Sequence, residues 1–174
     1  MPEPAQLRYV IGDATRPRGD ATHVQPRTEH IIIPHICNDA GAWGAGFVVA
    51  LSKRWKEPEI HYRRQRDWDG WRLGDAHYII VEPRTTVVNM IAQHNVGADS
   101  SGRAPIRYGA LVHAMNDVAG FCRTDISAWT SIHAPRFGSG LAGGDWNVIE
   151  ALILELWVEA GIPVTIYDLP KGTS

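Results

Sequence analysis

Hydrophobic residues fall into two kinds of run along this chain, one typical of strands and one typical of helices. Short runs rich in β-branched residues predict strands over residues 7–11, 30–37, 77–81, 86–92, 131–137 and 164–169. Apolar residues at helical spacing predict helices over residues 47–55, 59–68, 107–121 and 148–160. Strands that alternate with helices are typical of α/β folds, so we predict that class.

The run over residues 30–37 indicates how the sheet is covered. Its three consecutive isoleucines, 31–33, are typical of a strand that is buried on both faces. Such a strand needs helices above and below it, and we therefore predict a three-layer α/β/α sandwich. The runs 77–81 and 86–92 are separated by a short turn signal and are predicted to pair as neighbours.

Composition and charge place the chain among ordinary globular proteins. It has 44% hydrophobic residues, 21% charged residues and a formal net charge of −2, which excludes disordered, collagenous and membrane classes. We predict one domain over residues 1–174, with a core over 7–169 and an exposed loop over 14–29, a segment rich in proline and arginine. Neither a signal-peptide pattern nor a membrane-spanning apolar stretch is present, so we expect a cytoplasmic monomer without a membrane partner.

The cysteines and histidines argue against a metal site. Cys37 and Cys122 are too few for the four ligands that structural zinc takes, and we expect both to be reduced thiols. The histidines show no ligand spacing together with cysteine or carboxylate. No metal and no cofactor are therefore expected.

Two glycine-rich turns, over residues 38–46 and 136–144, each lie between a predicted strand and a predicted helix. Glycine lets backbone N–H groups face a ligand, and the start of a helix adds partial positive charge, so such turns suit phosphate oxygens. Together they predict a clamp for a diphosphate, whereas Asp145 is predicted to cap the following helix. A dinucleotide-binding Rossmann fold is disfavoured, because neither turn fits the fingerprint that opens its first strand–helix unit.

The order of these motifs resembles the macrodomain family, whose members are ADP-ribose-binding α/β/α modules. The likeness covers residues 9–169 and rests on the segments 9–15, 37–47, 135–141 and 164–167. It implies a three-layer sandwich of macrodomain type with a mixed central sheet of about six strands. It also implies that Asp13 accepts a hydrogen bond from adenine. The ligand-binding residues that the resemblance implies are Gly12, Asp13, Ala14, Asn38, Trp43, Gly44, Ala45, Gly46, Phe47, Arg136, Phe137, Gly138, Ser139, Gly140, Leu141, Ala142 and Tyr167.

Within the family, the chain looks most similar to the branch of terminal ADP-ribose glycohydrolases and DNA-ADP-ribose hydrolases. In that branch a lysine late in the central strand and an aspartate after the second loop carry catalysis. Here those places hold Gln93 and Ala142, and a neutral amide cannot serve as an amine nucleophile. The candidates for catalysis are therefore the polar residues at the distal-ribose end, Asn38, Asp39, Gln93 and His94.

Each catalytic candidate has a structural alternative. Asn38 is favoured as a ribose contact over a turn-stabilising asparagine. Asp39 is either a general base or a carboxylate that binds the loop backbone, and Gln93 either contacts the ligand or caps a backbone group. His94 has the side chain best suited to proton transfer near neutral pH, but a surface loop histidine is the favoured interpretation.

Aromatic residues near the predicted site also have two interpretations. For Trp43, covering the diphosphate is favoured, and the alternative is that its ring fills the core beneath the loop. Tyr167 either stacks on adenine or packs on its strand. The segment 61–72 interleaves arginines with aromatic residues, as in surfaces that hold single-stranded nucleic acid. A solvated helix face is the favoured interpretation of that segment.

These inferences lead to an expected function. We expect an ADP-ribosyl hydrolase that removes ADP-ribose from modified DNA bases or from acidic side chains of proteins, and so reverses ADP-ribosylation, including in DNA repair. Its expected partners are ADP-ribose and ADP-ribosylated DNA or protein. The alternatives are a non-catalytic ADP-ribose reader and an ADP-ribose 1″-phosphate phosphatase.

Overall fold

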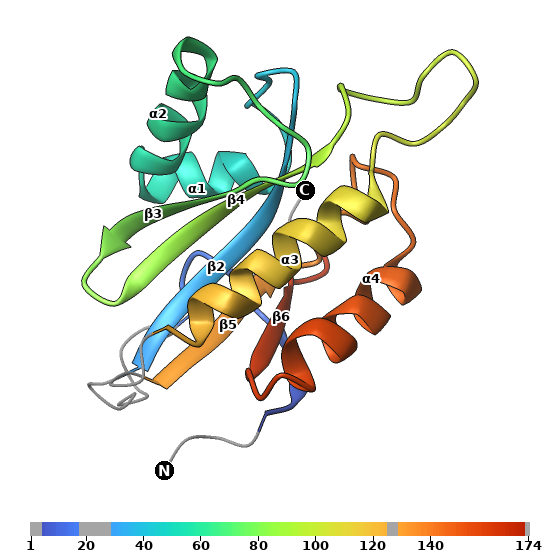
Figure 1. Ribbon diagram of the computed structural model, residues 1–174. Helices are drawn as coiled ribbons and strands as arrows, with labels where there is room; N and C mark the ends of the chain where they lie inside the picture. Colours follow the sequence, from blue (N-terminus) through green and yellow to red (C-terminus); the bar gives the residue numbers. More distant parts are fainter. Residues whose placement is uncertain (1–4, 18–28, 125–128, 173–174) are drawn as a thin grey trace.

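The computed structural model describes residues 5–17, 29–124 and 129–172 and shows a sheet with helices on both sides (Figure 1). The strands are β1 (Leu7–Ile11), β2 (Glu29–Asn38), β3 (Ala76–Glu82), β4 (Thr85–Gln93), β5 (Trp129–Pro135) and β6 (Val164–Asp168). The helices are α1 (Phe47–Arg54), α2 (Glu57–Arg64), α3 (Tyr108–Cys122) and α4 (Trp146–Ile153), with a 3-10 turn η1 (Gln65–Asp67) and a π-helical turn η2 (Leu154–Val158). Each predicted strand and helix is confirmed, with shifts of a few residues at the ends.

The six strands form one mixed sheet in the order β1-β6-β5-β2-β4-β3. Every neighbouring pair is parallel except β3 and β4, which pair antiparallel and confirm that these two runs are neighbours. In parallel strands the carboxyl ends meet at one edge, where ligands of open α/β sheets bind. The segments that follow β1, β2, β4, β5 and β6 therefore all begin at this edge.

Two separate hydrophobic clusters hold the layers together, and they confirm the predicted three-layer sandwich. On one face α3 and α4 bury apolar residues against the sheet, and the fully buried Trp157 donates a hydrogen bond from its ring to the carbonyl of Met115, at 2.9 Å. On the other face α1 and α2 contribute Leu51 and Tyr62. The three consecutive isoleucines of β2 divide between the clusters, because alternate side chains of a strand point to opposite faces.

Two local predictions concern the start of α4 and the exposure of the loop after β1. Asp145 caps α4 as predicted, because its side chain accepts a hydrogen bond from the backbone N–H of Asn147. The described residues of the predicted exposed loop over 14–29 are mixed, since Ala14, Thr15 and Glu29 are buried whereas Arg16 is exposed. Residues 18–28 of that loop lie outside the described residues.

Both cysteines are free and buried, as predicted for reduced thiols. Burial raises the pKa of the Cys37 thiol and the pKa of the Cys122 thiol, so both side chains behave as small apolar groups. Among the described residues no helix is long and apolar enough to cross a membrane.

Candidate functional site

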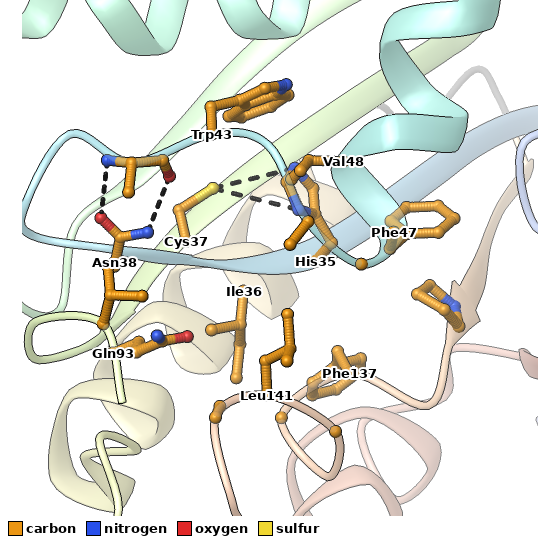
Figure 2. A pocket seen from close by; sticks show the side chains of 18 of the residues that line it. His35, Ile36, Cys37, Asn38, Trp43, Phe47, Val48, Gln93, Phe137 and Leu141 are labelled. Atoms are coloured by element: carbon orange, nitrogen blue, oxygen red, sulfur yellow. Dashed lines mark hydrogen bonds between the residues drawn. The ribbon is translucent and has the colours of Figure 1, made fainter. Parts of the chain in front are cut away.

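A cavity of about 570 Å³ lies at the carboxyl edge of the sheet, between the ends of β2, β4 and β5 (Figure 2). A cavity of this size is ordinary for a small-molecule ligand. It brings together both glycine-rich turns, which are about a hundred residues apart in sequence. Of the residues named from the sequence, those that line it are Asn38, Trp43, Gly44, Ala45, Gly46, Phe47, Gln93, Arg136, Phe137, Gly138, Gly140, Leu141 and Ala142.

The first glycine turn is held in shape by Asn38. Its side-chain oxygen accepts hydrogen bonds from the backbone N–H groups of Ala40 and Ala42, each at 3.0 Å, and its amide donates to the carbonyl of Ala42 at 2.7 Å. Figure 2 shows this side chain turned toward its own loop. In this structure Asn38 makes the contacts of the turn-stabilising alternative, because the asparagine amide matches the spacing of the loop backbone, while its ribose contact stays a prediction.

The turn leads directly into α1, and the start of that helix faces the cavity. Gly46 precedes the helix with φ 78° and ψ −147°, a conformation that is essentially restricted to glycine. Gly44 has open space where a Cβ would stand. The first turn of α1 carries no acidic residue, and Phe47 and Val48 line the cavity. Unpaired N–H groups at a helix start favour an anion at this end of the cavity.

The second glycine turn closes on itself. The N–H of Gly144 donates to the carbonyl of Gly138 at 2.7 Å, and Gly138 has φ 78°. The N–H of Ile106 donates to the carbonyl of Ala142 at 3.0 Å and so ties the turn to the segment before α3. Gly140, by contrast, has open space where a Cβ would stand.

We expect Gly144→Ala to destabilise the protein by about 2–3 kcal/mol, because the added methyl overlaps atoms that have no room to move. Its Cβ would stand 2.5 Å from the carbonyl oxygen of Gly138 and 2.7 Å from Cδ1 of Ile106. Urea denaturation measures the loss. Gly140→Ala is the matched control in the same turn and should change stability by no more than about 0.5 kcal/mol. Equal stabilities of the two variants would contradict the packing described for Gly144.

The lining of the cavity favours a negatively charged ligand. Among its described lining residues there is no carboxylate, and Arg136 carries the positive charge. The Arg136 guanidinium donates two hydrogen bonds to Asp168 and stands 4.9 Å from the Tyr9 ring centre and 5.0 Å from that of Trp146. The Arg136 guanidinium lowers the pKa of the Asp168 carboxyl, chiefly through these hydrogen bonds. Asp168 and the two rings therefore fix the position of Arg136.

His35, which lines the cavity from β2, is buried and neutral. Its Nε2 lies 2.6 Å from Oδ1 of Asn89, and the Asn89 amide donates to the carbonyl of Pro58, so Nε2 of His35 carries the proton. Nδ1 lies 3.9 Å from the sulfur of Cys37, as drawn in Figure 2. Burial lowers the pKa of His35 from 6.5 to about 4.

The stability of the protein should therefore fall in mild acid. Between pH 6.5 and pH 4 the unfolded chain binds a proton at His35 that the folded chain does not, so stability is full above this window and declines as the pH falls through it. From pH 6.5 to roughly pH 5 the loss is about 2 kcal/mol. Thermal or urea unfolding across this range measures it.

His35→Gln is the control for this pH dependence, because a glutamine amide still donates toward Asn89 but does not titrate. Burial also lowers the pKa of His61 and the pKa of His77, and both remain in the variant. The difference between the two proteins therefore isolates His35. Identical slopes of stability against pH would show that His35 does not cause the effect.

Trp43 does not cover the cavity as the favoured interpretation had it. Its ring is buried against Tyr62, with ring centres 5.2 Å apart, and its N–H donates to the hydroxyl of Ser52 at 2.8 Å. The ring touches the cavity only as part of its wall. The core beneath the loop has space for a large ring, and burial of that ring stabilises the loop from below.

Asp39 and His94 come together although neither lines the cavity. Oδ2 of Asp39 lies 2.7 Å from Nδ1 of His94, and its Oδ1 accepts a hydrogen bond from the N–H of Asn95 at 2.8 Å. His94 is 46% exposed in its side chain and stands in sequence between the lining residues Gln93 and Val96. The imidazole is therefore oriented by a carboxylate and reachable by solvent. Asp39 also ties the first glycine turn to the end of β4.

Gln93 lines the cavity from the end of β4. Its amide donates to the carbonyl of Asn95 at 3.0 Å, which is the backbone-capping alternative considered from the sequence. Ala142, at the other position discussed for catalysis, is buried and lines the cavity with a methyl group. The two amides on the cavity wall, those of Asn38 and Gln93, thus already bind the backbone.

The residues predicted to bind adenine lie outside the cavity, at the ends of β1 and β6. One oxygen of Asp13 accepts hydrogen bonds from the N–H and hydroxyl of Thr15, each at 2.8 Å. Tyr167 packs against the position of Gly12 and donates its hydroxyl to the carbonyl of Pro17 at 3.0 Å, which is the strand-packing alternative. The predicted residues outside the cavity are Gly12, Asp13, Ala14, Asp39, His94, Ser139 and Tyr167. The adenine contact of Asp13 and the ADP-ribose contacts of Gly12 and Ala14 stay predictions.

Sequence reasoning missed several residues of the cavity wall. The missed residues are His35, Ile36, Cys37, Ala42, Val48, Val96, Gly97 and Pro135. The last residues of a parallel strand are a usable signal for such positions, because they point into the edge where ligands bind. Gly97 after β4 repeats the strand-then-glycine pattern of the two turns. Among the described residues, no group of three or more potential metal ligands comes together.

Several solved structures resemble this fold. A protein of unknown function from Bacteroides thetaiotaomicron is 43% identical, with a TM-score of 0.84, over 94% of this chain and 98% of that one. A macrodomain protein from Streptomyces coelicolor is 40% identical, with a TM-score of 0.73, over 94% of this chain and 99% of that one. Thermosipho africanus DarTG in complex with ADP-ribose is 13% identical, with a TM-score of 0.63, over 82% of this chain and 39% of that one. At this identity the likeness shows the fold alone.

Curated relatives include a chromodomain-helicase-DNA-binding protein and a phosphatase, while no protein-family model matches the chain. Chromodomain-helicase-DNA-binding protein 1-like from Danio rerio is 29% identical over 177 residues, which cover 97% of this chain and 16% of that protein. The chain thus spans about a sixth of the length of that relative. An ADP-ribose 1″-phosphate phosphatase from Candida albicans is 18% identical over 150 residues, which cover 86% of this chain and 92% of that protein.

Proposed function

Because this chain belongs to the macrodomain family, we propose that its cavity binds ADP-ribose and that the protein releases ADP-ribose from modified DNA bases or from acidic side chains of proteins. The observation that carries the binding part is a cavity of about 570 Å³ between two glycine turns with no carboxylate among its described lining residues. Backbone N–H groups of both turns and Arg136 suit a diphosphate. The complex of Thermosipho africanus DarTG with ADP-ribose supports this choice of ligand.

The hydrolytic part of the proposal rests on the pair of Asp39 and His94. Asp39 holds Nδ1 of His94 as the protonated nitrogen, so Nε2 is the nitrogen that accepts a proton. In the structure the Asn95 side-chain amide lies 3.2 Å from Nε2, and in the proposed reaction a water molecule takes the place of that amide. The water attacks the anomeric carbon of the distal ribose and gives its proton to Nε2. The bond from that carbon to the target breaks, and the leaving carboxylate or base departs with the bonding electrons. No amine nucleophile is required, consistent with the neutral Gln93.

A non-catalytic reader is the second candidate function. It is favoured by one observation: the amides of Asn38 and Gln93, which line the cavity, already bind backbone groups. A reader predicts ADP-ribose binding without turnover. An ADP-ribose 1″-phosphate phosphatase, the activity named for the relative from Candida albicans, predicts phosphate release from that small molecule alone.

One experiment separates these functions. Saturating enzyme is incubated with an ADP-ribosylated oligonucleotide, with a protein ADP-ribosylated on glutamate and with ADP-ribose 1″-phosphate, and free ADP-ribose and phosphate are measured. The proposal predicts free ADP-ribose from at least one of the two macromolecules. ADP-ribose binding with no release identifies a reader, and phosphate release from the third substrate alone identifies a phosphatase. A protein that does not bind ADP-ribose overturns the proposal.

A further inference from the structure

A second cavity, of about 500 Å³, lies beside the first and shares a wall with it. It is lined by Ala40, Gly41, Arg63, Arg66 and Trp71. The segment over residues 38–43 separates the two cavities, because Asn38, Ala42 and Trp43 line the first one and Ala40 and Gly41 line the second. A molecule attached to a ligand in the first cavity therefore needs to cross only this short segment to reach the second.

Three aromatic rings, tilted by 40° and 35° from one to the next, pack against each other under that segment. The ring centres of Trp43 and Tyr62 are 5.2 Å apart, and those of Tyr62 and Trp71 are 5.3 Å apart. Tyr62 donates its hydroxyl to the carbonyl of Asn38 at 2.7 Å, and the ring N–H of Trp71 donates to the carbonyl of Tyr62 at 2.9 Å. The Trp71 ring presses on Gly41, where a Cβ would stand 2.4 Å from it. Both cavities are therefore built on one cluster of three packed rings.

The second cavity is positively charged. The Arg63 guanidinium is fixed by Glu59, at 2.8 Å, and by the carbonyl of Trp43. Arg66 is exposed and forms no ion pair among the described residues. The described residues that line the cavity include no carboxylate. The segment 61–72 is thus more than the solvated helix face favoured from its sequence, since Tyr62 is buried and Trp71 half-buried.

A planar ring beside two guanidinium groups suits one class of ligand in particular. Single-stranded nucleic acids are held by bases that stack on aromatic rings and by phosphates that contact arginine. An acidic peptide would use the two arginines but has no planar group for Trp71 to stack on. The combination of ring and charge therefore favours nucleic acid over peptide.

We propose that this second cavity is a subsite for single-stranded nucleic acid, in which one base stacks on Trp71 and the adjoining phosphates contact Arg63 and Arg66. The inference rests on the proposed function and deepens it, because it names nucleic acid as the part of the substrate that carries ADP-ribose. The shared segment 38–43 leads the strand from the anomeric carbon to the second cavity. Unmodified strand should also bind there, since the subsite does not need ADP-ribose to be present.

Fluorescence anisotropy with a labelled oligothymidylate of about ten nucleotides tests the subsite. We expect wild-type protein to bind it at low salt, and Arg66→Gln to weaken the affinity by about fivefold and reduce the slope of log K against log salt by about 0.7, because one phosphate contact is lost. Trp71→Leu should weaken the affinity by about tenfold. Arg64→Gln is the matched control, since Arg64 is an exposed arginine at the end of α2, two residues before Arg66 and outside the cavity, and its loss should leave affinity and slope unchanged.

ADP-ribose titration of the same proteins keeps this test separate from the proposed function and shows that the variants are folded. We expect Arg64→Gln and Arg66→Gln to bind ADP-ribose as the wild type does. Trp71→Leu also removes part of the floor beneath the first glycine turn, so the arginine variants decide the test. Oligonucleotide binding without ADP-ribose binding would overturn the proposed function and leave the subsite standing. The subsite is overturned if the oligonucleotide does not bind, if Arg64→Gln causes the same loss as Arg66→Gln, or if polyglutamate binds more tightly than the oligonucleotide.

Discussion

Gly140→Glu is expected to abolish ADP-ribose binding while leaving the fold intact. Gly140 has open space where a Cβ would stand and lines the cavity, so a longer side chain extends into the space for the ligand without striking the protein. The glutamate also places a negative charge where the diphosphate is proposed to lie. Calorimetric titration should show an affinity lower by roughly a hundredfold or more.

Gly120→Glu provides the matched control for this loss. Gly120 lies in α3, outside the lining of the cavity, and also has open space at the Cβ position. The same added charge should therefore leave ADP-ribose affinity unchanged, and both variants should unfold at temperatures close to that of the wild type. Gly140→Glu protein that binds ADP-ribose normally would show that the ligand lies elsewhere and would overturn the clamp formed by the two turns.

His94→Ala is expected to remove turnover and to preserve binding. If Nε2 of His94 takes the proton of the attacking water, its loss should lower the rate of ADP-ribose release by roughly a hundredfold to ten-thousandfold. His94 does not line the cavity, so the affinity for ADP-ribose should change by less than about threefold. Single-turnover release from the substrate that the wild type prefers, together with calorimetry, measures both quantities.

Two further variants test whether His94 acts as the base. Asp39→Asn should also slow release, because the pair at 2.7 Å no longer holds Nδ1 as the protonated nitrogen. His113→Ala changes a histidine of α3 outside the cavity and should leave release at the wild-type rate. Release that persists unchanged in His94→Ala would exclude this residue as the base.

Much of the fold was predictable from the sequence because local patterns dictate it. The strand predicted from the short apolar run over residues 7–11 coincides with the observed bounds of β1, Leu7–Ile11, and the glycine turns fall between strand and helix as predicted. Asp145 caps α4 through a contact two residues away, so the sequence contained both partners side by side. The ends of the helix predicted over 59–68 were less predictable, because a 3-10 turn replaces its last residues.

The roles of individual site residues were harder to predict from the sequence. Asn38 has the residue type of a ribose contact, but in the structure its side-chain amide is hydrogen-bonded to backbone groups of its own loop. Trp43 has space to fill in the core only because α2 places Tyr62 beneath the loop. Residue type limits what a side chain is able to do, whereas its neighbours decide which of those interactions it makes.

By itself, the sequence determined the strands, the helices, the two glycine turns and the edge of the sheet at which they meet, because these depend on local periodicity and on the short reach of the backbone. Only the tertiary structure decided that Asp39 meets His94 across 55 residues and that Arg66 and Trp71 face a second cavity behind the first turn. Such pairings depend on how the layers pack, and packing joins segments whose separation along the chain carries no information about their distance in space.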